Sequence, residues 1–171
     1  MGVSFYAVLE YMRYDLPTSF GRLSISRDHE LFAAIAFGEG GITEGMPHPP
    51  RGLPAQLSLD ALDVFFTEPD VVKEYLEASR LDDEKVPSIQ KYIEGWDEWA
   101  ILEHRDSGLL PIPETYSHSW LNLNELKEAL AHRNLSIDKR PADVRALIAA
   151  MEVLAREYGP ENVRLVFCFG M

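Results

Sequence analysis

One segment decides the fold of this chain: Val163-Arg164-Leu165-Val166-Phe167-Cys168-Phe169. Large apolar side chains occupy every second position, and this period of two is typical of a β-strand. Most of the intervening side chains are also apolar, so leaving either face of the strand in water would be unfavourable. The segment therefore predicts a buried strand.

A second strand of the same quality, Val3–Arg13, lies at the other end of the sequence. Both of its alternating sets of side chains are largely apolar, which predicts a central strand covered on both faces. Ala142–Tyr158 is the clearest helix, because apolar residues recur at i, i+3, i+4 and i+7 and Gly159-Pro160 ends it. Its apolar stripe consists of Val144, Leu147, Ile148, Met151 and Leu154.

These three segments predict an α+β fold, in which a small sheet containing both terminal strands packs against several helices. A chain of 171 residues fits a single domain over residues 1–171. The other expected elements are an extended piece over Gly21–Ser26, helices over His29–Phe37, Leu59–Phe66, Asp70–Arg80 and Pro87–Trp96, a strand over Trp99–Glu103, and a helix that begins at a capping box of Asn122 and Glu125. Ser26 or Asp28 caps the first helix, Ser58 caps the second, and Ser119 competes with Asn122 as a cap.

The negative charge of the chain is concentrated in its middle. The net charge is −12, and residues 61–110 carry thirteen Asp and Glu against five Lys and Arg, which accounts for −8 of it. We therefore expect an acidic helical segment at about residues 61–106. In the predicted helix Asp70–Arg80, the apolar stripe is Val72, Tyr75 and Leu76, and the carboxylates facing out are Asp70, Glu74 and Glu77. A pI near 4.8 argues against nucleic acid as a direct ligand, because phosphate contacts require clustered cations.

Cysteine and hydropathy patterns indicate a cytoplasmic protein. The single cysteine, Cys168, precludes an internal disulfide and fits a reducing compartment. The longest apolar run, around Ala33–Phe37, is far shorter than the ~18 residues of a membrane span. Met1–Val8 lacks the basic and apolar regions of a signal peptide. No histidine pair has the i, i+4 spacing of a helical zinc site, so we expect neither a metal nor a cofactor.

Four segments resemble a family of small proteins encoded by bacteriophages and prophages. They are Ser26-Arg27-Asp28-His29-Glu30-Leu31-Phe32-Ala33-Ala34, Arg51-Gly52-Leu53-Pro54, Ser117-His118-Ser119-Trp120-Leu121 followed by Glu125-Leu126, and Val163-Arg164-Leu165-Val166-Phe167. The resemblance spans most of the chain, and Leu81–Arg105 departs from it most. It implies a phage or prophage gene and the cytoplasm of a host cell, and it implies no catalytic residue.

The first functional hypothesis is a non-enzymatic accessory protein that binds a host protein. Exposed aromatic residues among carboxylates suit a docking surface for a basic partner. The predicted surface consists of Tyr92, Trp96, Asp97, Glu98, Trp99 and Glu103. A host nucleic-acid-handling enzyme is the natural target class, which would make the protein a counter-defence inhibitor. The alternative is a solvated acidic helix whose tryptophans belong to the core.

The second hypothesis is a small-molecule site, either in a hydrolase or in a protein that binds a nucleotide-like ligand. It would be assembled from Asp28, His29, Arg51, His118 and Ser119, with the Gly/Pro-rich segment Gly38–Pro54 as a lid. Each residue also has a structural interpretation. Ser119 would cap the following helix, His118 would bond a loop carbonyl, and Arg51 would pair with a carboxylate. The sequence makes no prediction about oligomeric state.

Overall fold

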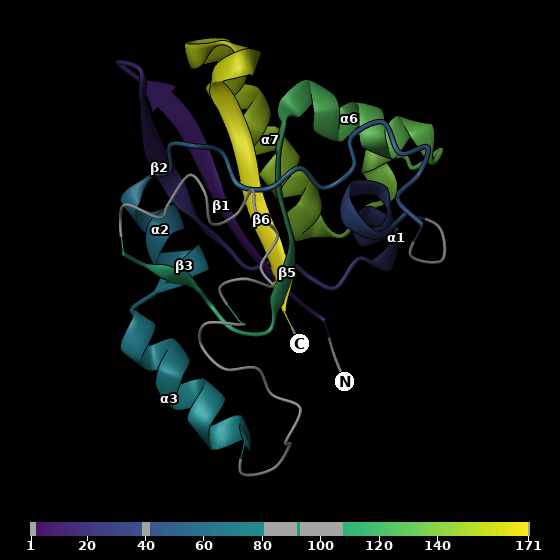
Figure 1. Cartoon of the computed structure of the whole chain (residues 1–171). Helices are drawn as coiled ribbons and strands as arrows, with labels where there is room; N and C mark the ends of the chain where they lie inside the picture. The colour runs from purple at the N-terminus through teal and green to yellow at the C-terminus, as the bar shows by residue number, and fades with distance from the viewer. Residues whose placement is uncertain (1–2, 39–41, 81–91, 93–107, 171) are drawn as a thin grey trace.

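The computed structural model describes residues 3–38, 42–80, 92 and 108–170. Its main sheet has four antiparallel strands in the order β2-β1-β6-β5 (Figure 1). Their bounds are Ser4–Arg13 for β1, Leu16–Leu23 for β2, Thr115–Asn122 for β5 and Val163–Gly170 for β6. Helices pack against this sheet, and both terminal strands belong to it. The α+β prediction is therefore confirmed.

The two terminal strands are direct neighbours at the centre of the sheet. β1 and β6 pair without interruption from Ser4 opposite Gly170 to Tyr11 opposite Val163. β2 follows β1 through a two-residue turn, in which Tyr14 and Asp15 have positive φ angles of 52° and 61°. Such a turn matches the twist of a hairpin. β2 begins at Leu16, five residues before the extended piece that we predicted.

One face of the sheet carries the larger core, beneath helices α1 (His29–Phe32), α6 (Leu123–His132) and α7 (Ala142–Tyr158) (Figure 1). A single π-helical turn, Ala33–Phe37, continues α1. Asp28 is the cap of α1, because its Oδ1 accepts a hydrogen bond from Leu31 N at 3.0 Å. All five residues of the predicted stripe on α7 are buried, which confirms how this helix packs: Val144, Leu147, Ile148, Met151 and Leu154.

The opposite face carries a smaller core under α2 (Leu59–Phe65). Side chains of β1 and β6 that point away from the larger core, such as Val8 and Cys168, pack here against Phe65. Ser58 caps α2 as predicted, since its Oγ accepts from Ala61 N at 3.3 Å. The sheet is thus covered on both faces, as the apolar character of β1 and β6 requires.

A separate lobe follows α2. It contains the two-stranded pair β3 (Phe66–Thr67) and β4 (Leu110–Pro111) and the helix α3 (Pro69–Arg80). Figure 1 shows α3 extending away from the main sheet. Its own small core consists of Val72, Leu76 and Leu110, with Tyr75 and Tyr92 packed against it. The stripe predicted for this helix therefore faces inward.

The sequence analysis missed strand β5. The register of β5 against β6 shifts between Tyr116 and Ser119, and Ser117 has a φ of 52°. This bulge interrupts the alternation of side chains, so the segment has no strand period in the sequence. Ser119 lies inside the strand and is not a helix cap. The capping box is confirmed instead, since Asn122 Oδ1 accepts from Glu125 N and Glu125 Oε2 accepts from Asn122 N, both at 2.9 Å.

Two predicted elements lie outside the described residues. They are the helix over Pro87–Trp96, of which only Tyr92 is described, and the strand over Trp99–Glu103. The acidic segment predicted for about 61–106 is described only over residues 61–80 and at residue 92.

Candidate functional site

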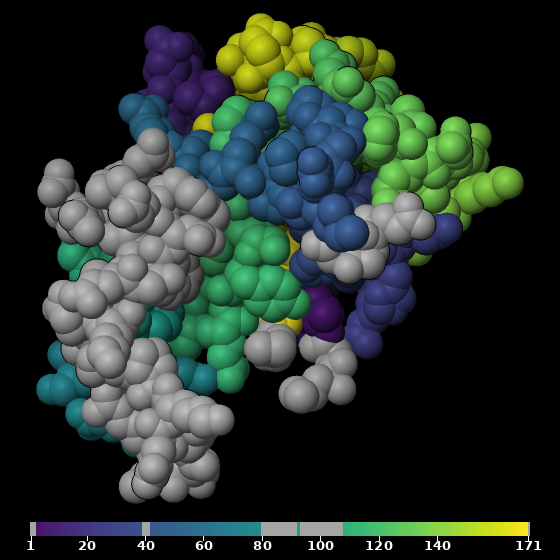
Figure 2. All heavy atoms as spheres, turned by 45° about the vertical axis from the view of Figure 1, so that its right-hand side comes forward, coloured from purple at the N-terminus to yellow at the C-terminus, as the bar shows by residue number. Residues whose placement is uncertain are grey.

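The segment that contains Arg51 lies along the outer edge of strand β5. Gly52 N donates to His118 O at 2.9 Å, and Arg51 N donates to Ser119 Oγ at 3.3 Å. Arg51 Nε also donates to Trp120 O at 3.1 Å. In Figure 2 the loop (blue) lies on the surface next to the green atoms of β5 and α6. The loop therefore covers edge groups of β5 that would otherwise be open to another strand.

The guanidinium of Arg51 joins this loop to helix α6. It donates two parallel hydrogen bonds to Glu125, at 2.9 and 2.6 Å, and its Cζ lies 3.6 Å from the centre of the Trp120 ring. Burial alone would raise the pKa of Glu125, but hydrogen bonds from Arg51 and from the Asn122 N–H outweigh it and the pKa is lowered. His48 adds a contact of 2.8 Å between its Nε2 and Glu128. Arg51 thus acts as a structural clamp.

His118 is a buried, neutral side chain. Its Nε2 lies 3.3 Å from Thr115 Oγ1, which donates its own proton to Ile112 O at 2.6 Å. Nε2 must therefore carry a hydrogen and donate it to Thr115. Burial lowers the pKa of His118 to about 4. At neutral pH the ring is an uncharged partner of Thr115, with its edge toward Phe65.

This burial predicts a specific loss of stability in acid. The unfolded chain binds a proton at His118 near pH 6.5, whereas the folded protein binds it only near pH 4. The contribution of His118 is therefore complete above pH 6.5 and is lost as the pH falls toward 4, by about 3 kcal/mol in total. Urea unfolding at pH 7 and pH 4 should show a loss larger by this amount in the wild type than in His118→Gln.

The matched control for that measurement is His29→Gln, which removes an exposed histidine. Its pH dependence should follow the wild type. If His118→Gln also follows the wild type, the histidine is not buried in its neutral form and the assignment is wrong.

The five residues of the predicted small-molecule site do not form one bonded set. Arg51, Ser119 and the backbone of His118 come together at β5. Asp28 is buried at the start of α1, where Arg140 Nη1 donates to both of its carboxylate oxygens at 3.1 and 3.2 Å, and His29 beside it is exposed. Among the described residues, no hydrogen bond joins Asp28 to the other three.

The arrangement at β5 is not that of a nucleophile and its base. Ser119 Oγ accepts a hydrogen bond from Arg51 N, whereas His118 Nε2 bonds Thr115. A hydroxyl nucleophile needs its own base within hydrogen-bond reach, and adjacent residues of a strand usually point to opposite faces. The chemistry available here is structural hydrogen bonding.

The residues predicted for the acidic docking surface are mostly outside the described part of the chain, namely Trp96, Asp97, Glu98, Trp99 and Glu103. Tyr92 is described. It packs on the core of the α3 lobe and its hydroxyl donates to Pro111 O at 2.9 Å. The described acidic surface is the outer side of α3, where Asp70, Glu74 and Glu77 are all exposed.

The sequence analysis also missed a fully buried ion pair. Glu10 has no exposed surface, and Arg164 donates from Nε to Glu10 Oε2 at 2.8 Å. Ser58 N donates to Glu10 Oε1 at 2.8 Å, and Arg164 also donates to Gln56 O. The signal was one charge in each of the two apolar strands. The register that places them opposite each other is visible only in the structure.

Three searches of the molecule complete this description. Among the described residues, no three His, Cys, Asp or Glu side chains are grouped as metal ligands, and no helix is long and apolar enough to cross a membrane. Cys168 is buried, and burial raises the pKa of its thiol. Comparison of the chain with family models, curated proteins and solved structures gave no match.

Proposed function

We propose that this chain is a non-enzymatic binding protein whose α3 lobe presents an acidic surface to a basic protein partner. The observation that carries the proposal is the outer face of α3. Asp70, Glu74 and Glu77 follow i, i+4 and i+7 spacing and are all exposed, opposite the buried Val72 and Leu76. One helix therefore presents three carboxylates in a row while its other face anchors the lobe.

The charge around this stripe is of one sign. Residues 61–80 carry five carboxylates against two cations, and residues 81–106 carry eight against three. Val71 on α3 is 51% exposed and supplies apolar area on the same helix. Acidic surfaces attract basic partners over a distance comparable to the Debye length, and apolar contacts then stabilise the complex.

The partner that fits this chemistry is a protein with a basic groove. A host nucleic-acid-handling enzyme has such a groove for phosphates, and a row of carboxylates can occupy it in their place. The resemblance of the four segments to phage and prophage proteins supports an accessory, counter-defence role in a host cell. The structural bonds made by Arg51, His118 and Ser119 favour binding over hydrolysis.

The proposal predicts that binding depends on where the negative charge lies. Reversal of Asp70, Glu74 and Glu77 to Lys changes the net charge from −12 to −6. We expect this variant to lose at least about tenfold of its binding to partners captured from bacterial lysate at low salt, and wild-type binding to weaken as salt is raised. Quantitative mass spectrometry of the captured proteins measures the loss.

The matched control reverses three exposed carboxylates elsewhere, namely Asp138, Glu157 and Glu161, and gives the same net charge of −6. It should capture the partner as well as the wild type does. Equal capture by the wild type and the α3 variant, with both proteins folded by thermal melting, would contradict the proposal.

A further inference from the structure

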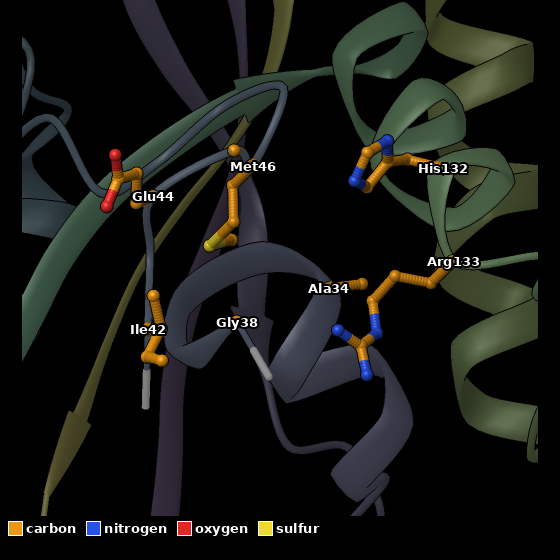
Figure 3. Close-up of a pocket in the computed structure, with 8 residues that line it drawn as sticks. Ala34, Gly38, Ile42, Glu44, Met46, His132 and Arg133 are labelled. Carbon is orange, nitrogen blue, oxygen red and sulfur yellow. The ribbon is translucent and has the colours of Figure 1, made fainter. Parts of the chain in front are cut away.

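A cavity of about 360 Å³ lies between the π-helical turn, the loop after it and the C-terminal end of α6 (Figure 3). This volume is within the range of small-molecule sites. The described residues that line it are Ala34, Gly38, Ile42, Glu44, Gly45, Met46, His132 and Arg133. None of them contributes to the acidic face of α3, so the cavity concerns a different part of the molecule.

The walls on the π-turn side are held by backbone contacts. Gly38 N donates to Ala33 O at 2.9 Å, and Gly38 has a φ of 61°. A Cβ atom at Gly38 would lie 1.7 Å from the Ile42 carbonyl oxygen, so only glycine permits this approach. Met46 N closes the next turn by donating to Thr43 O at 3.2 Å. Isolated π-turns are frequent at functional sites.

The opposite wall is fixed by the way α6 ends. Asn134 N donates to Ala131 O and Leu135 N donates to Leu130 O, both at 2.9 Å, and Asn134 has a φ of 56°. These bonds form a Schellman motif, which sets the direction of the chain at a helix end. His132 and Arg133 are the last residues before that reversal. Figure 3 shows both side chains extending from α6 toward the cavity.

The cavity is cationic on one side. Arg133 is only partly exposed and has no carboxylate within 4.0 Å among the described residues, although the chain has 28 acidic residues against 16 Lys and Arg. Four other arginines, Arg22, Arg51, Arg140 and Arg164, each pair with an acidic side chain. Arg133 is therefore available to an oxyanion, and its planar fork suits carboxylate or phosphate.

We propose that this cavity binds a small organic anion. Arg133, with His132 beside it, would bind a carboxylate or phosphate group, and Ala34, Ile42 and Met46 would contact the apolar part of the ligand. Glu44 on the loop disfavours a second negative charge at that end. The ligand is thus a monoanion-type molecule with one charged end and one apolar end.

Amide chemical shifts of Gly38 and Gly45 report on both sides of the loop and can be followed during titration. The probes are benzoate and phenyl phosphate, with benzamide as the uncharged analogue of benzoate. We expect the two anions to produce saturable shifts at or below about 10 mM, and benzamide to produce none in that range. Arg133→Gln should weaken binding of both anions at least about tenfold.

The matched control is Arg13→Gln, which removes one exposed arginine at the end of β1 and should bind the anions as the wild type does. Basic residues at a helix C-terminus also interact with the helix dipole, so His132→Gln is a second variant if Arg133→Gln unfolds; it should also weaken binding. Unchanged binding in the folded variants, equal binding of benzamide, or no saturable shift with either anion would overturn the proposal. None of these results bears on the acidic face of α3.

Discussion

Deletion of residues 163–171 is expected to prevent folding. This segment forms β6, which pairs with β1 on one side and β5 on the other, so its loss divides the sheet. It contributes Leu165, Phe167 and Phe169 to the larger core and Val166 to the smaller one. Burial of each such side chain is worth roughly 1.5–3 kcal/mol, and the sum is comparable with the whole stability of a domain of roughly 5–15 kcal/mol.

The measurement is the soluble fraction after expression, followed by thermal melting of whatever is recovered. A truncation that removes only Gly170 and the residue after it is the control, because it leaves both cores intact, and it should remain soluble with a cooperative transition. A soluble protein without residues 163–171 that melts cooperatively would show that β6 is peripheral.

Removal of Arg164 is expected to cost about 3–5 kcal/mol of unfolding free energy. Glu10 is completely buried, so Arg164→Met leaves its carboxylate with the Ser58 N–H and no counter-charge. The double variant Glu10→Gln, Arg164→Met removes both charges and should recover part of the loss. Urea unfolding at pH 7 of the two single variants and the double variant gives the coupling between the residues.

Arg156→Met provides the control, because Arg156 is exposed on α7. Its cost should stay within about 0.5 kcal/mol. Additive effects of Glu10→Gln and Arg164→Met would mean that the two side chains do not interact across the sheet, which would contradict the register of β1 and β6.

Several elements could be predicted because their causes lie within a few residues of one another. The alternation in β1 and β6 and the helical spacing in α7 are local patterns, and burial of one face follows directly from them. Caps behave in the same way, since Ser58 and the Asn122–Glu125 pair bond groups three residues away. The outward stripe of Asp70, Glu74 and Glu77 followed from helical spacing as well.

The details of the candidate sites could not be predicted, because they depend on residues far apart in the sequence. Arg51 meets Glu125 across 74 positions, and Arg164 meets Glu10 across 154. Neither distance has a local signature, and a charged residue in a sequence looks the same whether it is solvated or paired. The bulge in β5 removes the strand period itself, so pairing with β6 is what makes that segment a strand.

The sequence by itself therefore determined the terminal strands, the packing helix, the caps and the distribution of charge in this protein. Only the tertiary structure decided that the Arg51 loop covers the edge of β5, that Glu10 is buried with Arg164, and that His132 and Arg133 face a cavity beside the π-turn. The physical reason is that periodicity and capping act over a few residues, whereas burial and pairing of polar groups are set by which distant segments the folded chain brings into contact.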